Sequence, residues 1–232
     1  MNKKKAIVLL SGGIDSTTCL AQVVKSYGSD QVLALNIFYG QKHDRELKAA
    51  VNVADFYGVE YMRQDLSEVF KFSDCTLLQG RGDVPHGAYA SQTDGKTPVS
   101  TYVPFRNGLF LSYATVIALS VGASEVWYGA HADDAAGAAY PDCSRQFTQS
   151  MGRAIFYGTG EQVQVYAPFV AMTKTEVVAQ GLRLRAPYHL TWSCYEGGFK
   201  PCGICGTCID RAKAFAENTM EDPLIYGPPM EG

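Results

Sequence analysis

Two groups of residues in this sequence combine types and spacing that suit chemistry, and the first is a glycine-rich loop near the N-terminus. The loop Ser11-Gly12-Gly13-Ile14-Asp15-Ser16 follows a short apolar run and opens a stretch with helical spacing. A loop in this context binds phosphate, because its free backbone N–H groups and the positive end of the helix dipole point toward the oxygens. A plain glycine turn with a helix cap is the structural alternative, since one pair of glycines is weak evidence. We predict that a nucleotide contacts Leu10, Ser11, Gly12, Gly13, Ile14, Asp15, Ser16, Thr17 and Thr18.

The carboxylate of Asp15 needs a separate explanation within this loop. A carboxylate repels phosphate unless a cation lies between them, so we assign Asp15 either to a Mg²⁺ ion or to capping of the following helix. The loop is not a Walker A motif, because no lysine follows its glycines.

Four of the seven cysteines form the second group, at positions 194, 202, 205 and 208. Four thiolates complete a closed tetrahedral zinc site. Glycine follows two of these cysteines directly, which permits tight turns whose N–H groups point at sulfur. An iron–sulfur cluster is the alternative, since Cys-x₂-Cys-x₂-Cys also suits one. We predict a Zn²⁺ site formed by Cys194, Cys202, Cys205 and Cys208.

These two groups require a scaffold, and the hydrophobic pattern indicates one. Short apolar runs predict strands at residues 6–10, 32–38, 59–66, 125–129 and 163–166. Helical spacing occupies residues 16–27, 43–57, 106–122 and 143–157. Strands and helices alternate, which favours an α/β fold with a Rossmann-like, mostly parallel sheet and helices on both faces. In such a sheet, ligands bind beyond the carboxyl ends of the strands.

The amino-acid composition changes near residue 190, where Pro, aromatic, Cys and Gly residues become frequent. We predict a nucleotide-binding α/β domain over residues 1–190 and a C-terminal four-cysteine zinc-binding segment over residues 191–232, a small helical appendage whose last helix begins near Cys208. Residues 73–104, rich in Gly, Pro, Ser and Asp, are predicted to form a long surface loop or flap.

Composition and charge narrow the function classes. The 232 residues carry a formal charge of −3 and a pI near 5.8, which gives no general attraction to nucleic acids or anionic membranes. The basic N-terminus lacks the apolar stretch of a signal peptide, and the longest apolar run, at residues 109–121, is too short to span a bilayer. We therefore expect a cytoplasmic protein with no membrane partner and no direct nucleic-acid partner.

The motif SGGIDS after an N-terminal strand resembles the pyrophosphate-forming loop of the PP-loop ATPases. The resemblance implies an adenine nucleotide alpha hydrolase-like fold and the use of ATP with Mg²⁺. Such enzymes adenylate a carbonyl or carboxylate oxygen, release pyrophosphate, and let a nucleophile displace AMP.

Further motifs make the resemblance specific to one family. From about Lys5 to Arg211, the sequence closely resembles the QueC family of 7-cyano-7-deazaguanine synthases. The motifs that carry this resemblance are SGGIDSTT, FYGQKH, VPFRN, YPDC, PF followed by TKTE, and TWSCYEGG with CGICGTC.

Membership of that family would imply a defined reaction. The carboxylate of 7-carboxy-7-deazaguanine is adenylated, ammonia displaces AMP to give an amide, and a second ATP activates the amide before the nitrile forms. The resemblance also implies zinc on the four cysteines, a homodimer, and a product used in deazapurine modification of tRNA and sometimes of DNA. The residue after the initiator Met is Asn rather than Cys, which favours free ammonia, or ammonia from a separate glutaminase.

The substrate itself suggests which residues bind it. A guanine-like ring presents two adjacent N–H donors that one carboxylate accepts together, so Asp133, Asp134 and Asp142 are candidates, and we favour Asp134. Aromatic side chains such as Phe105 can stack on the base, with core packing as the alternative. The predicted substrate contacts are Tyr39, Gln41, Arg106, Asn107, Asp134, Tyr140 and Asp142.

Two basic residues are candidates to offset charge as pyrophosphate leaves, because nucleotidyl transfer depends on positioned cations. They are Arg106 and Lys174, for which a surface salt bridge is the alternative role. Thr173 and Glu176 form a capping box that puts Lys174 in the first turn of a helix, where a cation is unfavourable unless an anion binds nearby. We predict Asp15, Arg106 and Lys174 as catalytic residues.

Two other functions remain as alternatives. A tRNA-thiolating PP-loop enzyme would need a catalytic cysteine, for which Cys143 is the candidate, and a basic RNA-binding face that the negative net charge disfavours. A non-catalytic zinc-stapled binding module would leave the SGGIDS loop unexplained.

Overall fold

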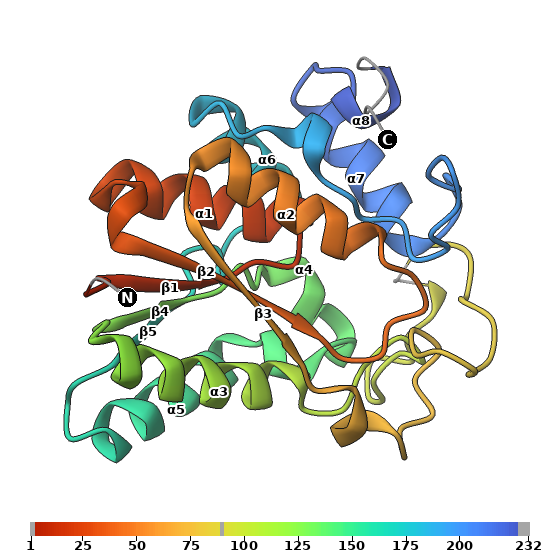
Figure 1. Cartoon of the computed structure of the whole chain (residues 1–232). Helices are drawn as coiled ribbons and strands as arrows, with labels where there is room; N and C mark the ends of the chain where they lie inside the picture. The colour runs from red at the N-terminus through yellow and green to blue at the C-terminus, as the bar shows by residue number, and fades with distance from the viewer. Residues whose placement is uncertain (1–2, 89–90, 227–232) are drawn as a thin grey trace.

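The computed structural model describes residues 3–88 and 91–226. Within them, five strands form one parallel sheet in the order β3-β2-β1-β4-β5 (Figure 1). The strand bounds are Ala6–Leu9 for β1, Val32–Phe38 for β2, Glu60–Asp65 for β3, Glu125–Trp127 for β4 and Gln164–Tyr166 for β5. Because β1 pairs with both β2 and β4, the direction of winding reverses beside β1 and leaves a crevice at the carboxyl ends of β1 and β4.

Helices cover both faces of this sheet (Figure 1). One face carries α1 (Ile14–Tyr27), α2 (Arg45–Tyr57), α6 (Lys174–Arg183) and α7 (Gly206–Glu217), and the other carries α3 (Arg106–Val121) and α5 (Arg145–Gly158). Two one-turn helices, α4 (Ala132–Ala135) and α8 (Pro223–Tyr226), and the 3₁₀ turns η1 (Ser29–Gln31), η2 (Ser67–Phe70), η4 (Ala136–Ala138), η5 (Pro141–Cys143) and η6 (Tyr188–Leu190) complete these elements. The predicted Rossmann-like fold is confirmed.

The alternation of side chains along the central strands builds two apolar layers. Ala6 and Val8 of β1 pack under α1, α2 and α6, whereas Ile7 between them packs against α3 and α5. Successive residues of a strand point to opposite faces of a sheet, so a continuous apolar run such as 6–9 is required when both faces are covered. The site therefore sits on a scaffold whose central strand β1 is buried at Ala6, Ile7 and Val8.

Local sequence signals set where several helices begin and end. The capping box predicted for α6 is present, since Thr173 accepts from the N–H of Glu176 and the Glu176 carboxylate accepts from the N–H of Thr173. Ser144 caps α5 through the N–H of Phe147. The left-handed Gly58 ends α2. The caps at Thr173 and Ser144 fix the starts of α6 and α5, and Gly58 turns the chain into β3.

The long segment between η2 and α3 contains no α-helix or strand among its described residues, and part of it is buried rather than displayed on the surface. Leu77, Leu78 and Val84 pack in one cluster with the cysteines of the C-terminal segment. Gly87 donates its N–H to the carbonyl oxygen of Ile204 at 2.8 Å. The predicted loop thus supports the four-cysteine segment.

A buried ion pair holds the last helices in place. Arg211 of α7 donates to both carboxylate oxygens of Asp222, at 2.6 and 2.8 Å, and also to Thr191 and to the carbonyl oxygen of Tyr188. Both charged side chains are almost completely buried, so the guanidinium requires these acceptors. The network connects α7 to the chain that precedes it.

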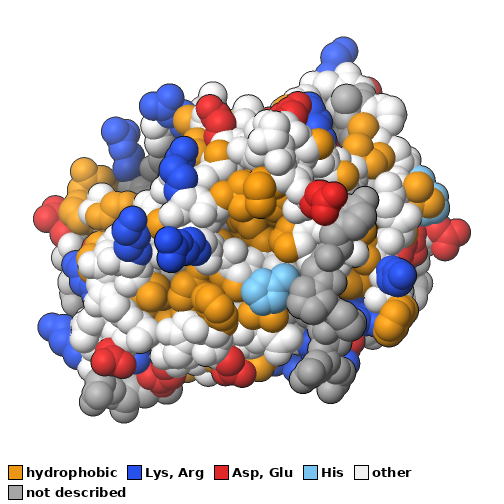
Figure 2. All heavy atoms as spheres, turned by 90° about the horizontal axis from the view of Figure 1, so that it is seen from above, with side chains coloured by type: hydrophobic (Ala, Val, Ile, Leu, Met, Phe, Trp, Pro, Cys, Tyr) orange, Lys and Arg blue, Asp and Glu red, His pale blue; other side chains and the backbone are white. Residues whose placement is uncertain are grey.

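Figure 2 shows the molecule from the side of α1, α2, α6 and α7. Apolar, basic and acidic side chains are mixed on this face, and Lys and Arg side chains gather at the left of the view, the end at which β1 begins. The crevice lies at the opposite, carboxyl end of the strands, so this basic gathering is separate from it. In the described part of the chain, no helix has the length and apolarity that crossing a bilayer requires.

Candidate active site

A cavity of about 230 Å³ opens at the carboxyl ends of β1, β2 and β4. Its walls come from the glycine-rich loop, from the first turns of α2, α3 and α6, and from the segment that leads into α7. The cavity therefore lies where the strand order reverses, which is the position expected for a ligand site in this class of sheet.

The glycine-rich loop forms one wall with its backbone in a conformation that only glycine supports. Gly12 has a φ of +92°, and a Cβ there would lie 2.4 Å from the carbonyl oxygen of Glu46 and 2.6 Å from the amide nitrogen of Ala50. Gly13 is the N-cap of α1 and brings no side-chain cap. The first-turn N–H groups of α1 therefore lack both an intrahelical acceptor and a cap, which leaves them for a bound anion.

The structure divides the predicted nucleotide residues into two sets. Leu10, Ser11, Gly13 and Ile14 to Ser16 line the cavity. Thr17 is fully buried, and the Thr18 hydroxyl bonds to the carbonyl oxygen of Ile14 and to the Tyr188 hydroxyl, so neither threonine is in the cavity wall. Both residues lie further along α1 than the loop, where the helix leaves the cavity and packs into the core.

Asp15 forms an ionic cluster at the loop end of the cavity. Its Oδ2 accepts a hydrogen bond from Nζ of Lys174, and its Oδ1 lies 3.8 Å from Nε2 of His131 and has no hydrogen-bond partner. Burial by itself would raise the pKa of Asp15, but the charges of Lys174 and His131 outweigh it and hold the pKa below its ordinary value. Asp15 and Lys174, far apart in sequence, are thus brought together as one charged pair.

Neighbouring aspartates of α4 have different surroundings. The Asp133 carboxylate accepts from the backbone N–H of Lys174 at 2.7 Å and so caps the start of α6. The Asp134 carboxylate lies 3.4 Å from Nε2 of His131 and lines the cavity. Of the three aspartates considered from the sequence, Asp133, Asp134 and Asp142, only Asp134 lines the cavity.

The α2 and α3 side of the cavity is chemically different. Arg106 donates to the Tyr39 hydroxyl at 3.2 Å, and its guanidinium lies 5.1 Å from the centre of the Tyr39 ring. Glu46, in the first turn of α2, also faces the cavity. Burial raises the pKa of Glu46 from its ordinary 4.5 to about 7, although the charge of Arg106 opposes this shift.

Some of the residues predicted to contact the substrate instead hydrogen-bond to other residues of the predicted set. Asn107 lines the cavity, and its backbone N–H donates to the Asp142 carboxylate at 2.8 Å. Asp142 is buried outside the cavity wall, as is Tyr140, whose hydroxyl lies 2.6 Å from that of Thr101. Gln41 lines the cavity while its side-chain oxygen accepts from the N–H of Tyr39. Asp142 therefore holds the first turn of α3, where Arg106 and Asn107 are placed.

Two acidic residues and one histidine of the cavity were not singled out from the sequence. Glu46 lies three residues after His43 of the FYGQKH motif, and Asp210 lies two residues after Cys208, so both follow motifs without belonging to them. His131 belongs to none of the motifs, and it lies between Asp15 and Asp134. Burial raises the pKa of Asp210, an effect that the charge of Lys174 opposes.

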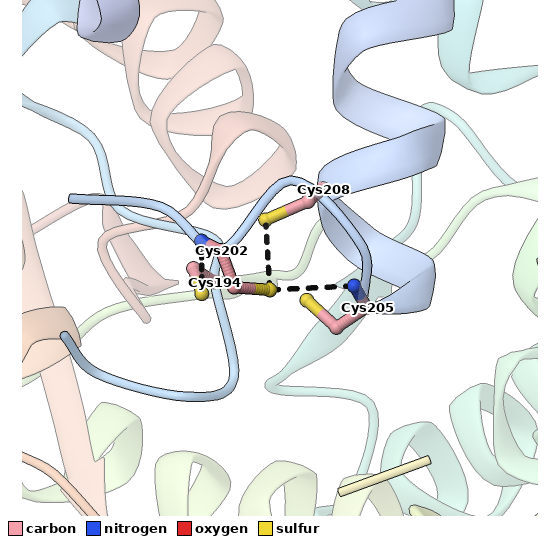
Figure 3. A group of neighbouring side chains, drawn as sticks. All are labelled: Cys194, Cys202, Cys205 and Cys208. Carbon is pink, nitrogen blue, oxygen red and sulfur yellow. Dashed lines mark hydrogen bonds between the residues drawn. The ribbon is translucent and has the colours of Figure 1, made fainter. Parts of the chain in front are cut away.

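The four cysteines converge as the sequence predicted (Figure 3). Their sulfur atoms lie within 4.8 Å of one another, and tetrahedral coordination with Zn–S bonds near 2.3 Å requires separations of about 3.8 Å. Backbone N–H groups of Cys202 and Cys205 point at the sulfurs of Cys194 and Cys202, each at 3.3 Å. The donor set fits a four-thiolate metal ion.

This cysteine cluster and the cavity share structural elements. Trp192, two residues before Cys194, lines the cavity and donates its backbone N–H to the carbonyl oxygen of Gly12. Thr207 and Asp210 of α7 line it as well. A metal ion on the cysteines would therefore fix one wall of the cavity.

The raised pKa of Glu46 gives a prediction about stability. Between about pH 4.5 and pH 7, the folded chain keeps a proton on Glu46 that the unfolded chain has lost, so wild-type stability falls as the pH rises through this window. The Glu46→Gln variant has no such loss. Denaturant titration measures the free energy of unfolding of both proteins. The difference, variant minus wild type, should be about 2 to 3 kcal/mol more positive at pH 8 than at pH 5. An equal difference at both pH values would contradict the assignment.

The chain is similar to proteins of one named family over nearly its whole length. The family model described as queuosine biosynthesis protein QueC matches residues 5–219. Similar proteins named 7-cyano-7-deazaguanine synthase include those of Archaeoglobus fulgidus, which is 42% identical over 95% of this chain and 90% of that protein, and of Caldicellulosiruptor bescii, which is 40% identical over 96% of this chain and 97% of that protein.

Solved structures resemble the chain at lower identity. An NH3-dependent NAD synthetase from Campylobacter jejuni matches with a TM-score of 0.50 and 17% identity, over 99% of this chain and 81% of that one. An NMN synthetase from Francisella tularensis matches with a TM-score of 0.50 and 13% identity, over 99% and 80%. At these identities, the likeness shows a shared fold.

Proposed function

The chain belongs to the QueC family of queuosine biosynthesis proteins, and on this premise we propose that it is a 7-cyano-7-deazaguanine synthase. It converts 7-carboxy-7-deazaguanine and ammonia to the corresponding nitrile and uses ATP to activate oxygen. One observation supports the proposal most strongly: the glycine-rich loop and Lys174 line the same cavity. That cavity also contains carboxylates and a guanidinium that can bind a base.

The first activation is adenylation of the substrate carboxylate. A carboxylate oxygen attacks the α-phosphorus of ATP, the bond from this phosphorus to the β-bridging oxygen breaks, and pyrophosphate leaves. The loop N–H groups and the hydroxyls of Ser11 and Ser16, which lie 3.0 Å apart, hold the departing pyrophosphate. Lys174 offsets the charge that accumulates on it.

Nitrogen enters in the next step. Ammonia attacks the acyl carbon, AMP leaves with its electron pair, and loss of a proton gives the amide. The amide oxygen then attacks the α-phosphorus of a second ATP and a second pyrophosphate leaves. The adenylated amide loses AMP, with the electron pair of the C–O bond, and two protons from nitrogen, which gives the nitrile. Both activations use the same loop, so one cavity serves the whole sequence of steps.

A divalent cation fits the loop end of the cavity. Asp15 and Asp134 supply the carboxylate oxygens that Mg²⁺ prefers, and Oδ1 of Asp15 is buried with no hydrogen-bond partner. Mg²⁺ bound there would neutralise phosphate charge. The four cysteines would hold Zn²⁺ in a structural role, because four thiolate ligands leave no open position for a reactant.

The tRNA-thiolating alternative needs a reactive thiol, and the described cavity disfavours one. Cys143 lines the cavity, but burial and the charges of Asp134 and Asp142 raise the pKa of its thiol well above the ordinary value. A cysteine in such surroundings is a poor nucleophile, because only the thiolate attacks.

The cellular location, the partners and the oligomeric state of the enzyme are part of the same proposal. It acts in the cytoplasm on small molecules, takes ammonia as the nitrogen donor, and binds no nucleic acid itself, since its product is incorporated by other enzymes. It works as a homodimer, and the exposed Val116 and Leu119 on the outer side of α3 provide an apolar surface for a second copy. Sedimentation measures this assembly.

The reaction can be tested directly. Protein incubated with ATP, Mg²⁺, ammonia and 7-carboxy-7-deazaguanine should form the nitrile, with AMP and pyrophosphate produced at about twice the amount of nitrile, because each nitrile requires an activation of the acid and of the amide. Mass spectrometry and a pyrophosphate assay measure these products. Pyrophosphate release that does not depend on the deazaguanine acid would contradict the proposal.

A further inference from the structure

The carboxylate of Glu46 stands apart from the other acidic groups of the cavity. Asp15 is paired with Lys174, Asp134 lies beside His131, and Asp210 of α7 also faces the cavity, within reach of the charges of Lys174 and Asp134. Glu46 is on α2, faces the same cavity, and takes part in none of the hydrogen bonds or ion pairs found among the described residues. A half-buried carboxylate without a partner is unfavourable, so its presence in a ligand cavity points to a partner that the ligand brings.

The position of Glu46 is fixed with respect to the phosphate-binding loop. Its own carbonyl oxygen lies against Gly12, at the place that a Cβ on Gly12 would occupy. The preceding residue, Arg45, lies over the ring of Trp192, with 5.1 Å between the guanidinium and the ring centre. The start of α2 is therefore held between the loop and the C-terminal segment, and the carboxylate is presented by a rigid element.

The neighbours of Glu46 complement one particular edge of a heterocycle. The guanidinium of Arg106 lies close enough to influence the pKa of Glu46 and faces the same cavity. Tyr39 and Phe110, whose ring centres are 6.0 Å apart, provide aromatic surface beside them. A carboxylate accepts two adjacent N–H donors, and a guanidinium donates to an exocyclic oxygen. A 2-amino-4-oxo pyrimidine ring offers that set in one plane.

Resting on the function proposed above, we propose that Glu46 is the specificity residue for the deazaguanine base. Its two carboxylate oxygens accept from the ring N–H and from the 2-amino group, while Arg106 donates to the exocyclic oxygen. Asp134, the residue favoured from the sequence, stays with His131 and Asp15 at the phosphate end of the cavity. Glu46 contacts the substrate at a distance from the reacting carboxylate, so it selects the base and has no role in bond formation.

The same arrangement distinguishes the substrate from the adenine of ATP. Adenine presents an amine beside a ring nitrogen that is itself an acceptor, and a carboxylate in front of that nitrogen is repelled. Glu46 therefore accepts the deazaguanine edge and rejects adenine. The two bases of the reaction are kept in separate parts of one cavity.

The test compares two substrates on several variants. The substrates are 7-carboxy-7-deazaguanine and its analogue without the 2-amino group. Wild-type enzyme should prefer the amino compound in kcat/KM by about 100-fold, since removing the donor leaves a carboxylate oxygen unpaired. Glu46→Gln, whose amide can accept through one atom only, should reduce this preference to about fivefold or less and leave the KM for ATP unchanged.

Controls separate base recognition from general damage. Asp44→Asn changes an exposed acidic residue just before α2 and should leave activity and preference unchanged. Asp134→Asn should keep the 100-fold preference even where its turnover is slower. If Glu46→Gln keeps the wild-type preference, the inference is wrong. If it is folded but too slow to assay, calorimetric binding of the two acids replaces kcat/KM, with the same two outcomes.

The outcome also separates this inference from the proposed function. Wild-type protein that releases no AMP with the deazaguanine acid would overturn the function, whatever the variant does. Wild-type protein that makes nitrile, together with a Glu46→Gln variant of unchanged preference, would overturn only the role of Glu46.

Discussion

The Cys205→Ser variant should lose its bound metal and nearly all nitrile-forming activity. Cys205 is fully buried and is the N-cap of α7, the helix that brings Thr207 and Asp210 into the cavity. A structural zinc site contributes on the order of 10 kcal/mol to folding, so a segment this small cannot keep its conformation once a ligand is removed. We expect less than about a tenth of the wild-type metal content, measured by elemental analysis, and partial loss of helical circular dichroism.

A matched substitution shows whether the effect belongs to the cluster. Cys75 is also buried but lies outside the four ligands, so Cys75→Ala should retain the metal and most of the activity. The same preparation identifies the metal, because a zinc protein is colourless and an iron–sulfur protein is brown. A Cys205→Ser protein with one metal per chain and full turnover would show that the cluster is not required.

The sequence predicted features that depend on short stretches of chain. The loop from Ser11 to Ser16 could be placed because its glycines follow an apolar run, and the four-cysteine cluster because thiolates at these spacings are typical of a metal site. The capping box of Thr173 and Glu176 is equally local. Each of these signals lies within a few turns of backbone, where propensity and spacing are informative.

The roles of single carboxylates could not be predicted in the same way. Asp142 and Asp134 look equivalent as base acceptors in the sequence, but Asp142 caps the start of α3 and Asp134 faces the cavity. Thr17 and Thr18 extend the loop motif, yet both are buried in the core where α1 leaves the cavity. Glu46 becomes a candidate only when α2 is packed against Gly12. These distinctions depend on tertiary contacts, which no local pattern encodes.

Replacing Lys174 by methionine should reduce turnover by about 100- to 1,000-fold, because a positioned cation that stabilises the departing pyrophosphate acts mainly in the transition state. Met keeps most of the length and apolar volume of the side chain and removes its charge. The KM for the deazaguanine acid should change little, since Glu46 and Arg106 bind the base elsewhere in the cavity. Steady-state assays of AMP formation measure both constants, with Lys213→Met of the exposed face of α7 as the control.

A purely structural role for Lys174 makes a different prediction. In that case, the variant would be slow because Asp15 is left buried without its partner, and Asp15→Asn in the same chain would relieve the unpaired charge and raise turnover to that of the Asp15→Asn single variant. If Lys174 acts on the phosphates, the double variant recovers thermal stability but turns over far more slowly than the Asp15→Asn single variant, because neither substitution supplies a cation. Equal turnover in the double variant and in the Asp15→Asn single variant would therefore assign the ion pair to the fold and remove Lys174 from the chemistry.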